Sequence, residues 1–252
     1  MSEASSSTAR LADFGATMPA RYRESFDQRA IDEHASIVSR RGGSPAHVEV
    51  WRRLDEGITV VCVVADDRPG LLSRITASLV IHSMDVVAAQ AYTRIGPSGS
   101  GEAVDLLWLR RMKAGGPPLS DPECARIADV LRALVTGEIS IDATVGDIPI
   151  AEPRVAFATR VAFSDTPTGP IVMTIETSDR PGLLLAITRA LFRSNVQIVA
   201  SDASTEDGRV VDRFTLLELD GSAIGEKRRR ALQTDVLAAV DAVARGSRLS
   251  PR

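Results

Sequence analysis

Aromatic residues, histidine and cysteine are all scarce in this sequence. Aromatic side chains make up 4% of its 252 residues, and it contains three histidines and two cysteines. Because two isolated thiols, Cys62 and Cys124, do not form a disulfide framework, we expect both to be buried and reduced in a cytoplasmic protein. The histidines show no ligand spacing with cysteines or carboxylates, so we expect neither a metal site nor a cofactor.

The sequence also lacks a strong excess of charge and any long apolar run. With a net charge of −3, no overall positive field attracts nucleic acid or acidic lipids. The apolar run Val60–Ala65 is far too short to span a bilayer, and the polar N-terminus does not resemble a secretory signal. The basic stretch Lys227–Arg230 lies next to acidic residues, which favours a solvated helix face. We therefore expect no nucleic-acid or membrane partner.

What the chain does contain is an internal repeat. The hexapeptide Asp-Arg-Pro-Gly-Leu-Leu occurs at residues 67–72 and again at 179–184, so the copies begin 112 residues apart. Matched residues continue beyond the hexapeptides: Ile75-Thr76 with Ile187-Thr188, Val87-Ala88 with Val199-Ala200, and Val104-Asp105 with Val211-Asp212. A repeat of this length indicates a duplicated small domain whose two copies act jointly.

The repeat and its flanking composition divide the chain into five parts. Serine, alanine and threonine dominate the first residues, and Pro19 then stands where a helix would begin, followed by Tyr22, Phe26 and Ala30 at helical spacing. The predicted parts are a flexible tail (1–17), a helical extension (18–44), a first domain with its linker (45–150), a second domain (154–245) and a C-terminal tail (246–252).

Each copy predicts the same order of elements. A β-branched strand precedes the hexapeptide, a helix follows it, and two further strands and a helix complete the copy. The order strand–helix–strand–strand–helix predicts an α+β fold of two tandem ferredoxin-like sandwiches, each with an antiparallel sheet and two helices on one face.

The fourth strand of each sheet has two candidates. The segments around Val48–Leu54 and Val161–Phe163 precede the central strands and can pair with them as hairpins, which is a circularly permuted arrangement. Alternatively, the alternating apolar residues of Ile139–Val145 supply a conventional fourth strand to the first copy. The second copy has no apolar strand after its last helix, which favours the permuted arrangement, but the sequence leaves the choice open.

The hexapeptide at the end of a β-branched strand, followed by a helix and then Asn195-Val196-Gln197-Ile198, resembles the ACT domain, a small-molecule regulatory module. The tandem pair, with residues 157–163 before the second copy and Met18–Tyr22 before the first, is similar to the C-terminal region of bacterial protein-PII uridylyltransferases. This resemblance covers about residues 18–245. The Gly-Ser and Asp-x-Asp motifs of that enzyme's transferase half and the His-Asp dyad of its hydrolase half are absent. The resemblance therefore implies a sensor without the catalyst.

The turn before each repeat helix is the candidate ligand site. Free N–H groups and the helix dipole at a helix start attract anions, and glycine at positions 70 and 182 lets a ligand carboxylate approach the backbone. Neighbouring arginines add charge, and polar side chains that open the next strand suit an ammonium group. The candidate ligand-binding residues are Asp67, Arg68, Gly70, Leu71, Asp85, Asp179, Arg180, Gly182, Leu183, Asn195 and Gln197. The alternative is that each turn uses glycine and proline for backbone geometry alone.

The two turns differ in their polar neighbours. Asp85 and Gln197 occupy equivalent positions, as do Ser83 and Asn195. Because the amides of Asn195 and Gln197 both donate and accept hydrogen bonds, we expect the second site to dominate. ACT domains, as the resemblance implies, use this turn and this strand start, often across an interface between modules.

We therefore expect a cytoplasmic, non-catalytic regulatory protein that binds an amino acid such as glutamine. Its partner would be a protein of nitrogen or amino-acid regulation, and the two ACT-like domains pair within one chain or in a homo-oligomer. Three alternatives remain: a regulatory remnant or subunit of a protein-PII uridylyltransferase system, an enzyme that retains uridylyl transfer, and a ligand-free structural dimerisation module.

Overall fold

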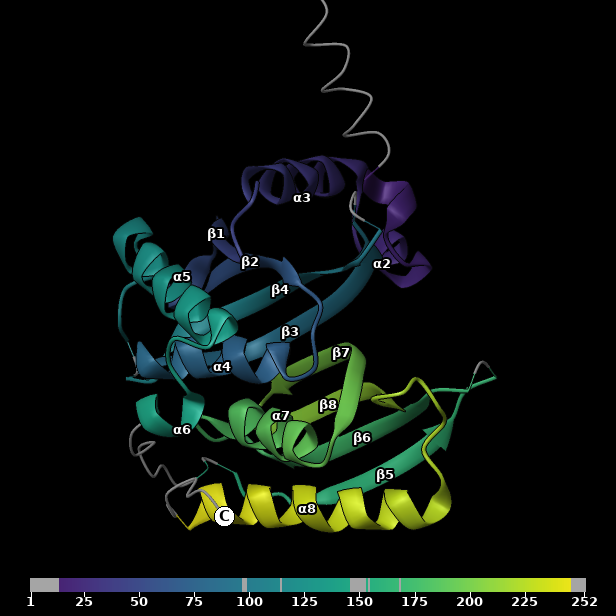
Figure 1. Ribbon diagram of the computed structural model, residues 1–252. Coiled ribbons are helices and arrows are strands. Elements are labelled where there is room, and N and C mark those ends of the chain that lie inside the picture. The colour runs from purple at the N-terminus through teal and green to yellow at the C-terminus, as the bar shows by residue number, and fades with distance from the viewer. Residues whose placement is uncertain are drawn as a thin grey trace, which may run out of the picture.

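The computed structural model describes residues 14–96, 99–113, 115–145, 153, 155–167 and 169–245. Residues 1–13 and 246–252 of the two predicted tails, and most of the linker between the copies, lie outside these ranges. In the described residues, eight strands form a single sheet in the order β1-β2-β4-β3-β7-β8-β6-β5 (Figure 1). All of its neighbouring strands are antiparallel. This confirms the predicted α+β class with tandem ferredoxin-like halves.

The two halves contain the same succession of elements. The first half consists of β1 (Ala46–Arg53), β2 (Thr59–Asp66), α4 (Leu71–Ile81), β3 (Met84–Ile95), β4 (Gly101–Arg111) and α5 (Asp121–Thr136), with the short 3-10 helix η1 (Asp55–Gly57) between β1 and β2. The second half consists of β5 (Arg160–Asp165), β6 (Ile171–Ser178), α7 (Leu183–Arg193), β7 (Val196–Glu206), β8 (Arg209–Glu218) and α8 (Glu226–Ala244).

The edge strand of each half comes from the segment before its central strand. β1 pairs with β2, and β5 pairs with β6, so the permuted arrangement holds in both halves. The alternative fourth strand at Ile139–Val145 is wrong: Ile141–Thr144 form the short helix α6, whose start is capped by Ser140. β1 also ends one residue earlier than predicted, since Leu54 lies outside it and is 43% exposed.

The repeat helices begin after the glycine of each hexapeptide. Gly70 and Gly182 adopt left-handed backbone conformations, with φ angles of 78° and 75°. An L-residue side chain disfavours this conformation, so glycine is required where the chain leaves the central strand and enters the helix. Pro69 and Pro181 lie in the turns before the helices, which begin at Leu71 and Leu183.

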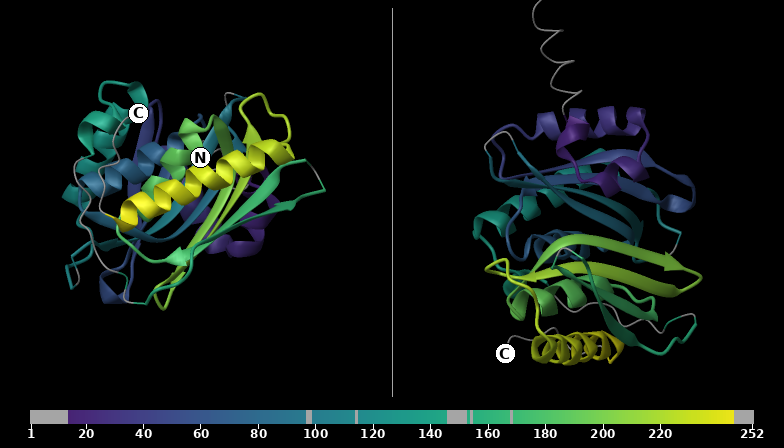
Figure 2. Two further views of the ribbon diagram at one scale, coloured as in Figure 1. Left: turned by 90° about the horizontal axis from the view of Figure 1, so that it is seen from below. Right: turned by 90° about the vertical axis from the view of Figure 1, so that its right-hand side faces the viewer.

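Helices cover the sheet unequally on its two faces. α4, α5, α7 and α8 pack on one face along both halves (Figures 1 and 2). On the other face, α2 (Ala20–Ser25) and α3 (Gln28–Arg40) cover strands of the first half. The alternation of β2 shows this directly: Val61 and Val63 pack under α4, whereas Cys62 and Val64 pack under α2 and α3. None of the helices in the described ranges is long and apolar enough to cross a membrane.

The N-terminal extension is two helices and not one. Phe26 is extended, with φ −129° and ψ 138°, and the Asp27 side chain accepts a hydrogen bond from the Ala30 N–H to start the second helix. The packed segment also begins before the predicted boundary at residue 17. Phe14 is 4% exposed, and the Thr17 hydroxyl accepts a hydrogen bond from Arg94 at 3.0 Å. Contacts with Arg94 of β3 hold this segment in place. The local sequence does not predict these contacts, because they join residues far apart in the chain.

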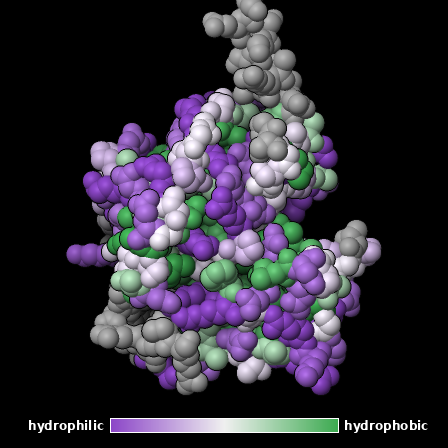
Figure 3. All heavy atoms as spheres, in the orientation of Figure 1, coloured by the Kyte–Doolittle hydropathy of each residue, from purple (hydrophilic) through white to green (hydrophobic). Residues whose placement is uncertain are grey.

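The two halves meet through β3 and β7 in the sheet and α4 and α7 on its covered face. Gln90 of β3 pairs with Asp202 of β7, and these residues occupy equivalent positions in the two copies. A residue that faces its own equivalent marks a two-fold relationship between the halves. Hydrophobic side chains are grouped at the level where the halves meet, with hydrophilic side chains above and below (Figure 3).

Candidate functional site

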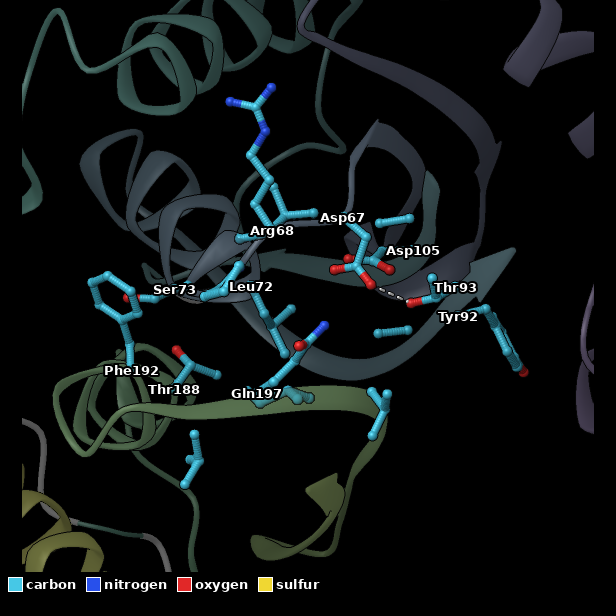
Figure 4. A pocket seen from close by; sticks show the side chains of 18 residues that line it. Asp67, Arg68, Leu72, Ser73, Tyr92, Thr93, Asp105, Thr188, Phe192 and Gln197 are labelled. Atoms are coloured by element: carbon cyan, nitrogen blue, oxygen red, sulfur yellow. Dashed lines mark hydrogen bonds between the residues drawn. The ribbon is translucent and has the colours of Figure 1, made fainter. Parts of the chain in front are cut away.

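A first hollow lies between the halves, at the first hexapeptide. Its empty volume is about 490 Å³, including space that is open to solvent, and Figure 4 shows the side chains that line it. The first half supplies the turn and the start of α4, together with parts of β3 and β4. The second half supplies α7 and the start of β7 through residues such as Thr188, Phe192 and Gln197. The structure thus brings five of the candidate residues together: Asp67, Arg68, Gly70, Leu71 and Gln197.

Two carboxyl groups, those of the partly buried Asp67 and the buried Asp105, line this hollow on the same side (Figure 4). Thr93 Oγ1 donates to Asp67 Oδ2 at 2.8 Å, and the Tyr92 backbone N–H donates to Asp105. Neither carboxyl has a lysine or arginine partner in the described residues. Burial raises the pKa of Asp105 to about 8, with a further contribution from Asp67, and burial also raises the pKa of Asp67. The pair is therefore suited to receive a positive charge.

The start of α4 faces the same space. Its first N–H groups lack partners from a preceding helical turn, as at any helix start, and the helix dipole favours negative charge there. Ser73 in this turn is 1% exposed and lines the hollow, and its hydroxyl has no hydrogen-bond partner in the described residues. A buried hydroxyl without a partner is costly, so this group favours a polar ligand.

Arg68 does not contribute to this hollow in the way the sequence predicted. Its guanidinium donates to Asp66 at 3.0 Å, and Figure 4 shows the side chain directed away from the carboxyl pair. Gly70 instead provides space at the interface between the halves. A Cβ atom at this position would lie 2.5 Å from the ring of Phe192 in α7. The glycine therefore allows close contact between the turn and the other half.

A second, smaller hollow of about 270 Å³ lies at the second hexapeptide. It is lined by four of the candidate residues: Asp179, Arg180 and Leu183 from the second half and Asp85 from β3 of the first half. Arg110 joins two carboxylates here, at 2.9 Å from Asp85 and 2.5 Å from Asp179. The Gly182 backbone N–H also donates to Asp85. Burial raises the pKa of Asp85, while Arg110 and Gly182 oppose that rise.

Two predicted residues lie elsewhere than expected. Gln197 faces the first hexapeptide and not the second, because each half presents its strand start to the turn of the other half. Asn195 lies just before β7 with φ 52° and lines neither hollow. Its equivalent, Ser83, has φ 56°, so both are turn residues in the left-handed region.

Sequence reasoning missed two functional candidates, Asp105 and its equivalent Asp212. Asp212 is 2% exposed in the second hollow, and burial raises its pKa to about 8. The sequence did contain a signal for them, an aspartate in the matched pairs Val104-Asp105 and Val211-Asp212 of two largely apolar strands. These pairs were used only to align the two copies. In the described ranges, no three histidine, cysteine or acidic residues are grouped so that they could hold a metal ion.

No family model matches the chain. Among curated proteins, it is similar to the bifunctional uridylyltransferase/uridylyl-removing enzyme of Rhodospirillum rubrum, with 27% identity over 230 residues, covering 86% of this chain and 24% of that enzyme. The same enzyme of Phenylobacterium zucineum is 29% identical over 235 residues, covering 87% and 23%. That of Ruegeria pomeroyi is 30% identical over 207 residues, covering 79% and 22%.

A solved structure of an unknown protein from Galdieria sulphuraria aligns with 75% of this chain at 16% identity. Its TM-score of 0.22 is too low to indicate a shared fold. The chain spans about a quarter of the length of the curated relatives. With its tandem repeat and α+β architecture, it therefore resembles one part of the bacterial bifunctional uridylyltransferase/uridylyl-removing enzymes.

Proposed function

We propose that this chain is a non-catalytic regulatory protein that binds an amino acid in the first hollow. The observation that carries the proposal is the pairing of two kinds of group across one space. The partly buried Asp67 and the buried Asp105 are carboxyls without a cationic partner in the described residues, and Ser73 offers an unpartnered hydroxyl at the start of a helix. An α-amino acid carries the two opposite charges that such a site can receive.

The assignment of ligand groups follows from charge. The α-ammonium binds beside Asp67 and Asp105, because a bound cation favours the ionised form of carboxyls whose pKa burial has raised, and the ionised form in turn stabilises the cation. The α-carboxylate binds at the start of α4, with the Ser73 hydroxyl as an additional donor. Gln197 reaches the hollow from the second half, and its amide both donates and accepts hydrogen bonds (Figure 4). It is the group best placed to recognise a polar ligand side chain, and glutamine is the first ligand to test.

The regulatory effect follows from the hollow's position. A ligand in contact with both α4 and β7 favours the arrangement of the halves that gives it the most contacts. Coupling energies of about 1–3 kcal/mol are enough to change the affinity for a partner several-fold. The partner would be a cytoplasmic protein of nitrogen or amino-acid regulation. The same chain can form a homo-oligomer through surfaces outside the hollow.

A second candidate function is favoured by the comparisons. All of the relatives described above are bifunctional enzymes, and the chain matches only about a quarter of each. It can therefore act as a regulatory remnant or subunit within a uridylyltransferase system. Incubation with UTP, magnesium and a PII-type protein separates this role from catalysis: uridylyl transfer by the chain alone would contradict the non-catalytic proposal.

Thermal unfolding with each of the twenty amino acids at millimolar concentration tests ligand binding. A ligand at a hundredfold excess over its Kd stabilises the folded state by about 2.7 kcal/mol. For a chain of this size, we expect the unfolding temperature to rise by about 5–10 °C. If no amino acid produces a rise, the proposal fails, and sedimentation analysis would then test the structural dimerisation module.

Matched variants locate the site. Asp105→Asn removes an ionisable carboxyl from the first hollow, and Ser73→Ala removes its hydroxyl, so both should abolish or greatly reduce the ligand-induced rise. Asp212→Asn makes the equivalent change in the second hollow and should preserve it. The reverse pattern would place the ligand at the second hexapeptide.

A further inference from the structure

The second hexapeptide turn already holds a carboxylate that belongs to the chain itself. Asp85, from β3 of the first half, reaches the turn at the start of α7. Its carboxylate accepts hydrogen bonds from the Gly182 backbone N–H and from Arg110, at 2.9 Å. Asp85 is 6% exposed, so this arrangement is an interior feature of the interface between the halves.

The contacts of Asp85 are those expected for a bound carboxylate. α7 is 11 residues long, and the N–H groups and dipole at its start favour a negative charge. Arg110 adds a charge-assisted hydrogen bond and also binds Asp179 of the turn at 2.5 Å. A buried carboxylate remains ionised only with such partners. The negative charge of Asp85 is therefore balanced by groups from both halves, the Arg110 guanidinium and the Gly182 N–H.

The first hollow lacks the equivalent groups. Asp85 pairs across the sheet with Arg110, and at the matching positions of the second copy Gln197 pairs with Leu217. The second half consequently offers the first turn a neutral amide and an aliphatic side chain. The carboxylate and its arginine are therefore present at the second hexapeptide turn but not at the equivalent first turn.

We propose that the second turn is a carboxylate-binding site that the chain fills with its own Asp85. The residue acts as an internal ligand, which keeps the second site closed to external carboxylates and leaves the first hollow as the open one. This inference does not depend on amino-acid binding in the first hollow, because it concerns different residues and a different ligand group.

Removal of the internal ligand should make the site accept an external one. Asp85→Ala leaves Arg110 and the Gly182 N–H in place and creates space beside the existing hollow of about 270 Å³. Acetate carries the lost group at a suitable size. We expect sodium acetate to raise the unfolding temperature of Asp85→Ala by several degrees and to leave the unmodified protein unchanged relative to sodium chloride at equal ionic strength.

Two control variants separate site occupancy from general salt effects. Asp85→Asn keeps the shape of the side chain without its charge, so it leaves no room for acetate and should show no specific stabilisation. Gln197→Ala makes a comparable truncation at the equivalent position, where Leu217 replaces the arginine, and should also not respond. Asp85→Ser is a second test variant for the case that the alanine variant folds poorly. Its hydroxyl can accept a hydrogen bond from the Gly182 N–H.

Acetate-specific stabilisation of Asp85→Ala or Asp85→Ser, absent from both controls, supports the proposal. Equal responses to acetate and chloride overturn it, as does a response of Gln197→Ala equal to that of Asp85→Ala. If both test variants stay unfolded with acetate as without it, the proposal also fails, because a carboxylate that fits the site should restore the missing contacts. Failure of amino-acid binding at the first hollow would leave all these outcomes unaffected.

Discussion

The hydroxyl oxygens of Thr76 and Thr188 lie 3.3 Å apart, although the two residues are 112 positions apart in the chain. They are equivalent residues of the repeat, one on α4 and the other on α7. Contact between equivalent atoms places the approximate two-fold axis between these helices. The same axis runs between Gln90 and Asp202 in the sheet, because these two residues are also equivalent and pair with each other. The two hollows are therefore related by this axis, and the spacing of α4 and α7 affects both.

Enlargement of the side chain at this contact should weaken the interface between the halves. Thr76 is 1% exposed, and its hydroxyl also donates to the Leu72 carbonyl at 2.9 Å. Thr76→Leu adds volume to a packed site, and such overpacking costs about 1–3 kcal/mol. Urea unfolding should show that loss. Thr234→Leu, on the exposed face of α8, is the control and should change the free energy of unfolding by less than about 0.5 kcal/mol.

Substitution of Gly70 should reveal the close contact with Phe192. Gly70→Ala adds a Cβ atom in a left-handed conformation, which costs about 1–2 kcal/mol, and places it 2.5 Å from the Phe192 ring. Gly137→Ala has the same kind of backbone strain, at φ 81°, but nothing lies within 4 Å of its Cβ position. Gly70→Ala should thus be the more destabilising variant.

The Phe192→Ala background isolates the steric part of this effect. With the ring removed, Gly70→Ala should cost about as much free energy of unfolding as Gly137→Ala does. A cost of Gly70→Ala that is the same with and without Phe192 would show that the ring moves aside freely, contrary to the close packing between the turn and α7.

Asp105 should make the folded protein less stable as pH rises. Burial raises its pKa to about 8, whereas an unfolded chain has an aspartate pKa of about 3.9. Between these values the folded state retains a proton that the unfolded state loses, so stability falls with increasing pH. Asp105→Asn removes the part of this dependence that comes from Asp105, whereas the part from Asp212, whose pKa burial also raises to about 8, remains. The variant should match the unmodified protein near pH 4 and exceed its free energy of unfolding at pH 8 by up to about 5 kcal/mol, given about 1.4 kcal/mol per pKa unit.

The comparison for Asp105 is best made by urea unfolding across this pH range. Asp129→Asn, in an exposed position on α5, should leave the pH profile unchanged. An Asp105→Asn profile parallel to that of the unmodified protein would contradict a raised pKa of Asp105 in the folded state.

His34 should produce a pH effect of the opposite sign. It is fully buried under the N-terminal extension, with its Nδ1 2.6 Å from the Tyr22 hydroxyl, and burial lowers its pKa to about 4. The unfolded chain takes up a proton near pH 6.5, so the contribution of His34 to stability should fall as the pH drops from about 6.5 to 4, by up to about 1.4 kcal/mol per pH unit. His34→Gln should remove this slope in urea unfolding. Persistence of the slope would assign it to other groups.

Local sequence determined the elements of each half. The repeated hexapeptide predicts a turn and a helix because Gly70 and Gly182 permit a backbone conformation that other residues disfavour. A β-branched run identified the first central strand, and apolar alternation identified the segment before it as a strand. These properties depend on neighbours in the chain, so one sequence is sufficient to read them.

Only the tertiary structure decided which residues share a site. The repeat showed that Asp85 and Gln197 occupy equivalent positions in the two copies. It did not show that each of them faces the turn of the other half. It also did not reveal that Asp105 is buried beside Asp67, or that Arg110 joins two carboxylates across the interface. Those facts arise from the β3–β7 pairing and the contact of α4 with α7. Contacts between halves depend on long-range packing, which local periodicity does not encode.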